Sequence, residues 1–360
     1  MNNSIQSVIT GSGSYIPELI VSNKDFIQTA FFDSSGTPIN KKNEEIIEKF
    51  KQITEIEERR YITDDLVLSD IAYFAAIDAL LSSDSDKESL DYIIVAHNFG
   101  DVRKENKRSD LVPSISSRVK HKLRIKNPHT VAYDITFGCP GWLQAVIQAD
   151  YYLKSGDAKR ILVIGAETLS RISDPHDRDT MLYSDGAGAV IIEAMEGTIN
   201  TGILTHKSRS DTFEEAYLLS MKKSFDPNSG IDDLFLKMNG RKLYEYALKT
   251  VPLVIKECIQ KSGIQIDEIK KILIHQANAK MDEAILKRLF DLYDKKEIPE
   301  KIMPMTISWL GNSSVATLPT LYDLLLKGKI KGQSLKSGEV ILFASVGAGM
   351  NINSMLYRIR

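Results

Sequence analysis

Cysteine is scarce in this chain: Cys139 and Cys258 are the only two among 360 residues. Two thiols cannot form a disulfide framework, and no CxxC pair or clustered His/Cys spacing indicates a zinc site. A basic leader before an apolar run is also missing, and no run approaches the ~18 apolar residues of a membrane-spanning helix. We therefore expect a cytoplasmic protein with no metal and no membrane segment.

The chain also lacks a large excess of charge of either sign. The net charge is −2, and acidic and basic residues are interspersed along the chain. No polybasic tail or acidic block points to nucleic acid or to a membrane surface, although a local basic patch stays open. At this length the apolar content suffices for one large domain or for two halves with their own cores.

Residues 134–156 combine one thiol with the signals of a helix start. Gly138 precedes Cys139, Pro140 and Gly141 follow it, and proline suits the first helical turn. An apolar stripe at helical spacing then runs through Trp142, Ala145, Val146, Ala149, Tyr152 and Leu153. We expect Cys139 at the cap of a buried helix, where free N–H groups and the macrodipole favour a thiolate. Taken alone, the pattern fits an activated nucleophile or a small core cysteine.

The other cysteine lies in a different context. Cys258 belongs to an amphipathic stretch, VPLVIKECIQKSG, which predicts a structural role on a helix. Elsewhere, apolar runs typical of buried strands occur at 90–97, 159–166 and 184–194, and a helix-period run occurs at 68–81. The polar composition of 23–51 and 103–124 predicts surface segments.

The second part of the chain repeats the pattern of the first. Residues 270–275 resemble 91–96, 337–345 resemble 155–166, and 310–329 resemble 137–156, with Asn312 opposite Cys139. Such agreement predicts an old duplication, with halves at 1–196 and 197–360. Two strand–helix–strand repeats indicate an α/β fold with parallel strands buried between helices. Functional groups of such halves tend to meet at their interface.

Three features of the second half are candidates to join the cysteine. His275 ends an apolar strand in ILIHQANAK, and taken alone it fits a core or surface histidine as well as a functional one. Asn312 lies in a Gly-Asn-Ser-Ser helix start, where asparagine is a good N-cap. The glycines of VGAG, Gly347 and Gly349, make a simple turn or let backbone N–H groups approach a reacting carbonyl.

These motifs occur in one order along the whole chain: FGCPGW, HQAN, GNSS and a near-terminal glycine turn. Together with ITGSGSYIPE, DPHDRDTMLYSDGAGAV and MNGRKLYEYA, they resemble the ketoacyl-acyl-carrier-protein synthase III branch of the thiolase-fold condensing enzymes. The resemblance implies a five-layered αβαβα sandwich, a homodimer and a catalytic set of Cys139, His275 and Asn312.

The resemblance also implies a two-step reaction without a cofactor. Cys139 accepts a starter acyl group, and backbone N–H groups of Cys139, Gly347, Ala348 and Gly349 hold the oxyanion. A malonyl-type or β-ketoacyl thioester then reacts, and His275 and Asn312 donate hydrogen bonds to the enolate left by decarboxylation. The product is a β-ketoacyl compound, either linear or cyclised.

Substrate contacts are expected from the same resemblance at Arg178, Gly240 and Asn278. Where relatives that use coenzyme A carry a Trp and an Arg against adenine, this chain has Lys49 and Ile53. Arg178 matches the other adenine-side Arg of those relatives, so half of the clamp is missing, which favours a starter on acyl carrier protein or as a small thioester over coenzyme A. Lys280, Lys287 and Arg288 form the basic pattern expected to meet that acidic carrier, although a solvated helix face would look the same.

Several alternatives stay open. The Cys-Pro-Gly-Trp context and the long 23–51 segment resemble relatives that make dialkylresorcinol and cyclohexanedione rings in secondary metabolism. A cysteine hydrolase or acyltransferase would use the same Cys/His pair. A non-condensing partner subunit usually loses the nucleophile, and a degradative thiolase needs a second cysteine near the C-terminus, where this chain has none.

Overall fold

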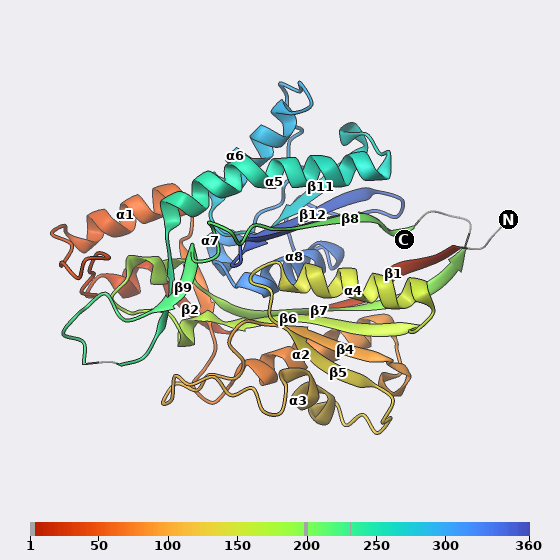
Figure 1. Ribbon diagram of the computed structural model, residues 1–360, viewed down its shortest axis with the longest axis horizontal. Coiled ribbons are helices and arrows are strands. Elements are labelled where there is room, and N and C mark those ends of the chain that lie inside the picture. Colours follow the sequence, from red (N-terminus) through yellow and green to blue (C-terminus); the bar gives the residue numbers. More distant parts are fainter. Residues whose placement is uncertain (1–3, 198–200, 231) are drawn as a thin grey trace.

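The first sheet is built from the most continuous apolar runs of the chain. The computed structural model describes residues 4–197, 201–230 and 232–360 (Figure 1). The sheet has the order β1 (Ser4–Tyr15), β7 (Asp185–Gly197), β6 (Arg160–Thr168), β4 (Tyr92–Ala96) and β5 (Val131–Ile135). β4 pairs in parallel with both β5 and β6, whereas β7 is antiparallel to β6 and to β1. β4 and β6 are buried along almost their whole length, as central strands covered on both faces must be.

The second sheet repeats this pairing pattern. Its order is β8 (Gly202–Ser210), β13 (Asn351–Arg358), β12 (Val340–Gly347) and β11 (Ile269–Ile274). β11 and β12 are parallel, and β13 is antiparallel to β12 and to β8. All strands of the first sheet precede residue 198 and all of the second follow residue 201. This correspondence supports the duplication and the division near residue 196, which stay proposals.

The expectation of parallel strands is therefore right for the central strands and wrong for the others. β12 and β13 are joined by only residues 348–350, and a connection of that length permits antiparallel pairing only. The parallel pairs β4/β6 and β11/β12 are separated by long connections that contain helices.

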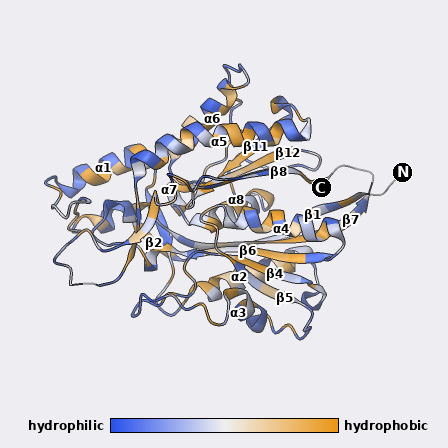
Figure 2. Ribbon diagram, in the orientation of Figure 1, coloured by the Kyte–Doolittle hydropathy of each residue, from blue (hydrophilic) through white to orange (hydrophobic). Residues whose placement is uncertain are grey.

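Helices form three layers around the two sheets (Figure 1). α4 (Gly141–Ser155) and α8 (Thr317–Leu326) lie between the sheets, where their side chains share one core with both. α2 (Leu68–Ser83) and α3 (Ile115–Lys122) cover the outer face of the first sheet. α5 (Gly240–Ser262) and α6 (Ala279–Asp291) cover the second. The outer helices α5 and α6 alternate apolar and polar stripes, which fits a face against the sheet and a face toward water (Figure 2). The result is the expected αβαβα sandwich.

The two segments expected on the surface are partly buried. The 103–124 segment contains α3, whose Ile115 and Val119 lie in the core against α2. The 23–51 segment leads into α1 (Asn43–Thr54), and its Phe31 and Ile46 pack on Met181 in a small cluster of their own. Both expectations rested on average polarity, which hides an amphipathic helix with few apolar residues.

Short elements complete the fold. They are β2 (Leu19–Ser22) paired with β3 (Glu58–Tyr61), β9 (Leu219–Lys222) paired with β10 (Phe235–Met238), and α7 (Ile307–Leu310). Six 3-10 turns are also present in the described residues, among them η4 (Arg178–Leu182) and η6 (Ser314–Ala316). None of the helices in the described ranges is both long and apolar enough to span a bilayer. A cytoplasmic location stays a prediction.

Candidate active site

Cys139 lies in the loop between β5 and α4. Gly138 before it has a φ of +65°, and a Cβ there would lie 2.7 Å from both the N and the O of Ala348. The first helical residue of α4 is Gly141, and Pro140 is its cap. Cys139 therefore precedes the cap by one residue instead of forming it. The loop is fixed by a backbone contact with the far end of the chain that only glycine permits.

The environment of Cys139 does not favour a thiolate at rest. The residue keeps some exposure to solvent, yet burial raises the pKa of its thiol to about 11. The charge of Glu167 raises the pKa further, and a hydrogen bond from Ser314 Oγ to Cys139 Sγ, at 3.3 Å, acts to lower it. The expectation of a lowered pKa at a helix end is wrong for the resting protein, because desolvation outweighs the groups that stabilise the anion.

The glycine turn after β12 packs directly on the cysteine. A Cβ on Gly347 would lie 2.5 Å from Cys139 N and 2.8 Å from Cys139 Cβ. Ala348 is the residue that contacts Gly138, and its carbonyl accepts a hydrogen bond from Asn351 Nδ2 at 2.8 Å. Gly349 has a φ of +135°, which favours glycine. The predicted oxyanion residues are therefore close together, and their role as donors stays a prediction.

Asn312 lies in the loop between α7 and η6. Its N–H donates to Leu182 O and its carbonyl accepts from Ser184 N, both at 2.9 Å. Its side-chain Oδ1 accepts the N–H of Ser314 at 2.9 Å, so the NH₂ end is the end left for other partners. α8 starts only at Thr317. Asn312 therefore does not cap α8 itself, but its Oδ1 holds the N–H of the first residue of η6, the 3-10 turn that leads directly into that helix.

The loop that precedes Asn312 packs against a buried arginine. Arg59 is completely buried, and its guanidinium donates to Met181 O, Val21 O and Asn23 Oδ1. Burial lowers its pKa to about 10, so it still carries its charge at neutral pH. A Cβ on Gly311 would lie 2.8 Å from Arg59 Cβ. Arg59, in β3, therefore connects the loop before Asn312 to β2 and to η4.

His275 directly follows β11, the strand beside β12. Its backbone N–H donates to Ala344 O at 2.8 Å, and its side chain is buried. Burial lowers the pKa of the imidazole to about 4, so the ring is neutral at neutral pH and has one N–H to donate. Among the described residues, Nδ1 of His275 has no hydrogen-bond partner. Because β11 and β12 are parallel, His275 lies at the sheet edge where Gly347 meets Cys139.

The three expected substrate residues differ in their settings. Arg178 is exposed at the first position of η4, and Gly240 is exposed at the first position of α5. Asn278 caps α6, where its Oδ1 accepts the N–H of Met281 at 3.1 Å. The structure thus gives Asn278 a structural function as a helix cap, and contact with substrate stays a prediction for all three.

The basic side chains of α6 are exposed, but each already has a partner within the chain, either an acidic side chain or a backbone carbonyl. Lys280 lies 3.5 Å from Glu55, Lys287 lies 3.0 Å from Asp291, and Arg288 Nη1 donates to Leu248 O at 3.2 Å. We refer to Lys280, Lys287 and Arg288 as the α6 bases. Exposed pairs of this kind contribute about 0–1 kcal/mol each, so an acidic partner can replace them at small cost.

Sequence reasoning missed a polar chain beside the cysteine. Glu167, at the end of β6, is completely buried, and its Oε2 accepts from Asn98 Nδ2 at 2.6 Å. Asn98 Nδ2 also approaches Ser314 Oγ at 3.4 Å, and Ser314 Oγ contacts Cys139 Sγ. Burial raises the pKa of Glu167 to about 7. One signal was present in the sequence, since Glu167 is the acid that ends the apolar run ILVIGA.

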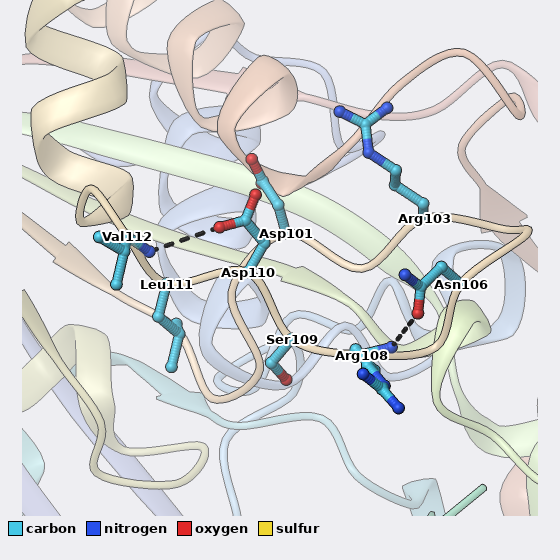
Figure 3. A pocket seen from close by; sticks show the side chains of 8 residues that line it. All are labelled: Asp101, Arg103, Asn106, Arg108, Ser109, Asp110, Leu111 and Val112. Atoms are coloured by element: carbon cyan, nitrogen blue, oxygen red, sulfur yellow. Dashed lines mark hydrogen bonds between the residues drawn. The ribbon is translucent and has the colours of Figure 1, made fainter.

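A surface hollow of about 390 Å³ lies apart from these residues (Figure 3). It is lined by residues of the loop between β4 and α3, including Arg103 and Arg108. Its two carboxylates, Asp101 and Asp110, are both bound by Arg118 at 2.6 Å. These pairs fold the loop onto α3, and the hollow contains none of the predicted site residues. In the described ranges, no group of three or more His, Cys, Asp or Glu side chains is arranged to hold a metal.

The fold defines a class: an α/β sandwich of two sheets and three helix layers, in which a cysteine at the start of a central helix packs against the glycine turn after β12. Residues 133–212 match the family 3-Oxoacyl-[acyl-carrier-protein (ACP)] synthase III, and residues 259–359 match its C-terminal part. Among curated proteins, the β-ketoacyl-[acyl-carrier-protein] synthase III of Xanthomonas campestris pv. campestris is 31% identical over 362 residues, covering 99% of this chain and 100% of that protein. The same enzyme of Bradyrhizobium diazoefficiens is 33% identical over 359 residues, covering 98% and 99%.

A solved structure agrees with this assignment. The crystal structure of 3-oxoacyl-[acyl-carrier-protein] synthase III from Aquifex aeolicus matches with a TM-score of 0.78 at 29% identity, covering 98% of this chain and 99% of that one. The chain belongs to the 3-oxoacyl-[acyl-carrier-protein] synthase III family and is a condensing enzyme of the acyltransferase type.

Proposed function

We propose that this chain condenses a starter acyl group, held on Cys139, with a malonyl-type thioester. The observation that carries the proposal is the contact of the Gly347–Gly349 turn with Cys139, because it places backbone from the C-terminal strands against the one partly exposed thiol of the described chain. Backbone N–H groups aimed at a reacting carbonyl stabilise the oxyanion of a tetrahedral intermediate.

In the first half-reaction, Cys139 attacks the carbonyl carbon of the starter thioester. The carrier thiol leaves with the proton that Cys139 gives up, and an acyl-cysteine results. Because burial raises the pKa of Cys139 to about 11, the thiol must lose its proton as the substrate binds or reacts. The Ser314 hydroxyl stabilises the developing negative charge on sulfur.

In the second half-reaction, a malonyl-type thioester loses carbon dioxide and leaves an enolate. His275 and the Asn312 NH₂ donate hydrogen bonds to the enolate oxygen, and the carbanion attacks the acyl-cysteine carbonyl. The carbon–sulfur bond breaks, and Cys139 leaves as the thiolate. A neutral imidazole suits this task, because it donates without first taking a proton.

The partners follow from the same proposal. Acyl carrier protein brings one or both thioesters to the face that carries the α6 bases, and coenzyme A is the poorer starter carrier. Lys49 and Ile53, at the positions of the adenine clamp, are both exposed on α1 and offer no flat cationic or aromatic surface. We also propose that the working unit is a homodimer.

The geometry of the site argues against one alternative function and does not distinguish another. A degradative thiolase would need a second cysteine at the site, but Cys258 is completely buried on α5 with its sulfur toward Thr205 O. A hydrolase differs only in what accepts the acyl group, so it is separated by experiment.

Intact-protein mass spectrometry tests the proposal. The protein is incubated with a panel of acyl thioesters on acyl carrier protein and on coenzyme A, and a malonyl thioester is then added. We expect an acyl adduct on Cys139 that disappears when β-ketoacyl product forms. An adduct that is lost to water at the same rate with and without malonyl thioester identifies a hydrolase and refutes the condensation.

A further inference from the structure

The polar chain from Glu167 to Cys139 is formed by residues from three separate parts of the sequence. Glu167 is at the end of β6, Asn98 is two residues after β4, and Ser314 is the first residue of η6. Asn98 and Ser314 are 216 positions apart, and Ser314 and Cys139 are 175 apart. η6 packs against β6, so the three meet beside the nucleophile.

We propose that Glu167 is a positioning residue for Cys139, acting through Asn98 to aim the Ser314 hydroxyl proton at the Cys139 sulfur. This rests on the proposed role of Cys139 as the nucleophile. Glu167 itself does not touch the sulfur, so its effect must pass along the chain of hydrogen bonds.

The direction of each hydrogen bond follows from the donors available. Above its pKa of about 7 Glu167 is ionised and only accepts, so the Asn98 group at 2.6 Å from Glu167 Oε2 is then its NH₂, and that bond fixes the amide orientation. The second proton of the same NH₂ is left for Ser314 Oγ at 3.4 Å. Because that bond occupies a lone pair of the serine oxygen, the hydroxyl proton is free to point at Cys139 Sγ.

The backbone of Ser314 is also held in one conformation, which fixes the position of its hydroxyl group. Its φ is +52°, a conformation that residues other than glycine seldom adopt, and its N–H is held by Asn312 Oδ1. The serine is also buried, so water does not compete for its hydroxyl. One turn therefore fixes both the hydroxyl beside the sulfur and the amide of Asn312.

Glu167 is placed where a purely structural carboxyl is costly. It is completely buried, and in the described part of the chain its Oε1 has no hydrogen-bond partner. The titratable groups that face it are His97, Asp185 and Cys139. His97 is bound to Asp134 and Gly100 instead, so Asn98 is the side chain that Glu167 holds. When ionised, Glu167 also repels a thiolate through space.

Glu167 accepts a hydrogen bond from Asn98 and repels a Cys139 thiolate. Two variants that separate these effects are expected to differ in the reactivity of Cys139. Glu167→Gln keeps an oxygen that accepts from Asn98 and removes the repulsion. Glu167→Leu removes both the acceptor and the repulsion. Orientation of the serine therefore predicts that Gln preserves the reactivity of Cys139 and that Leu lowers it.

The test is the rate of Cys139 alkylation by iodoacetamide between pH 6 and 10, followed by intact mass on the full-length protein. Ser314→Ala should slow alkylation at pH 8 about tenfold and move the pH profile upward, because a hydrogen bond to the thiolate is lost. Asn98→Ala and Glu167→Leu should slow it in the same direction, and Glu167→Gln should be at least as fast as wild type. Ser354→Ala, the same change at a buried serine near Cys258, is the matched control and should leave the profile unchanged.

A double variant shows whether Asn98 acts through the serine. Asn98→Ala added to Ser314→Ala should slow alkylation no further than Ser314→Ala alone, because the path is already broken. Additive losses overturn the proposal, and so do equal rates for Glu167→Leu and Glu167→Gln. Asn98 is only half-buried, so the Asn98→Ala variant is expected to fold. It therefore still tests the proposal if Glu167→Leu fails to fold. A wild type that is alkylated at Cys139 but takes no acyl group from any thioester refutes the proposed function alone.

Discussion

Replacing Glu167 by glutamine should make the protein less sensitive to alkaline pH. Burial raises the pKa of this carboxyl from the ordinary value of 4.5 to about 7 in the folded protein. Between these values the folded state binds the proton more tightly than the unfolded state, so its stabilising effect is present below pH 4.5 and is lost as pH rises through 7. A shift of this size corresponds to roughly 3 kcal/mol of unfolding free energy above pH 7. Glutamine is neutral at every pH and keeps an acceptor for Asn98.

Equilibrium urea unfolding at pH 5 and pH 8 measures this effect. The stability of Glu167→Gln relative to wild type should increase by roughly 2–3 kcal/mol between the two pH values, because the groups common to both proteins cancel. Glu193→Gln is the matched control with the opposite sign: the pKa of Glu193 is lowered, and its carboxylate is bound by Arg160 at 3.0 Å. That variant should be less stable than wild type by nearly the same amount at pH 5 and at pH 8, because a lowered pKa places its change in stability below pH 4.5. A difference for Glu167→Gln that is the same at both pH values refutes the reasoning.

Three further predictions concern the reaction. Cys139→Ala should abolish the acyl adduct in mass spectrometry, whereas Cys258→Ala should retain it, and loss of the adduct in the second variant alone would falsify the assignment. Asn312→Ala should depress condensation by ~10²-fold or more and acyl transfer much less, giving acyl-enzyme without product; His275→Ala should do the same, and equal losses in both half-reactions would make Asn312 purely structural. Reversing the charge of the α6 bases should raise the KM for acyl carrier protein and leave coenzyme A thioesters unaffected, and insensitivity to the reversal would sink the docking proposal.

The α/β class, the family motifs and the segments that carry the candidate residues could be predicted from the sequence alone, and the αβαβα layers came through the resemblance to the family. These features depend on local patterns. The helix period of 68–81 and the apolar run of β4 follow from side-chain spacing, and Gly138 and Gly347 mark close backbone approaches. The family motifs are short and contiguous, so they can be read without the fold.

The tertiary structure decided the electrostatics of the site. A helix end next to Cys139 predicts a low thiol pKa, but burial and the charge of Glu167 raise it to about 11. Glu167 and Asn98 are unremarkable in the sequence, and their meaning comes only from contacts with Ser314. The direction of the outer strands and the buried side of 23–51 likewise depended on connection length and packing. Desolvation and long-range hydrogen bonds depend on which distant segments pack together, and that is a property of the folded chain alone.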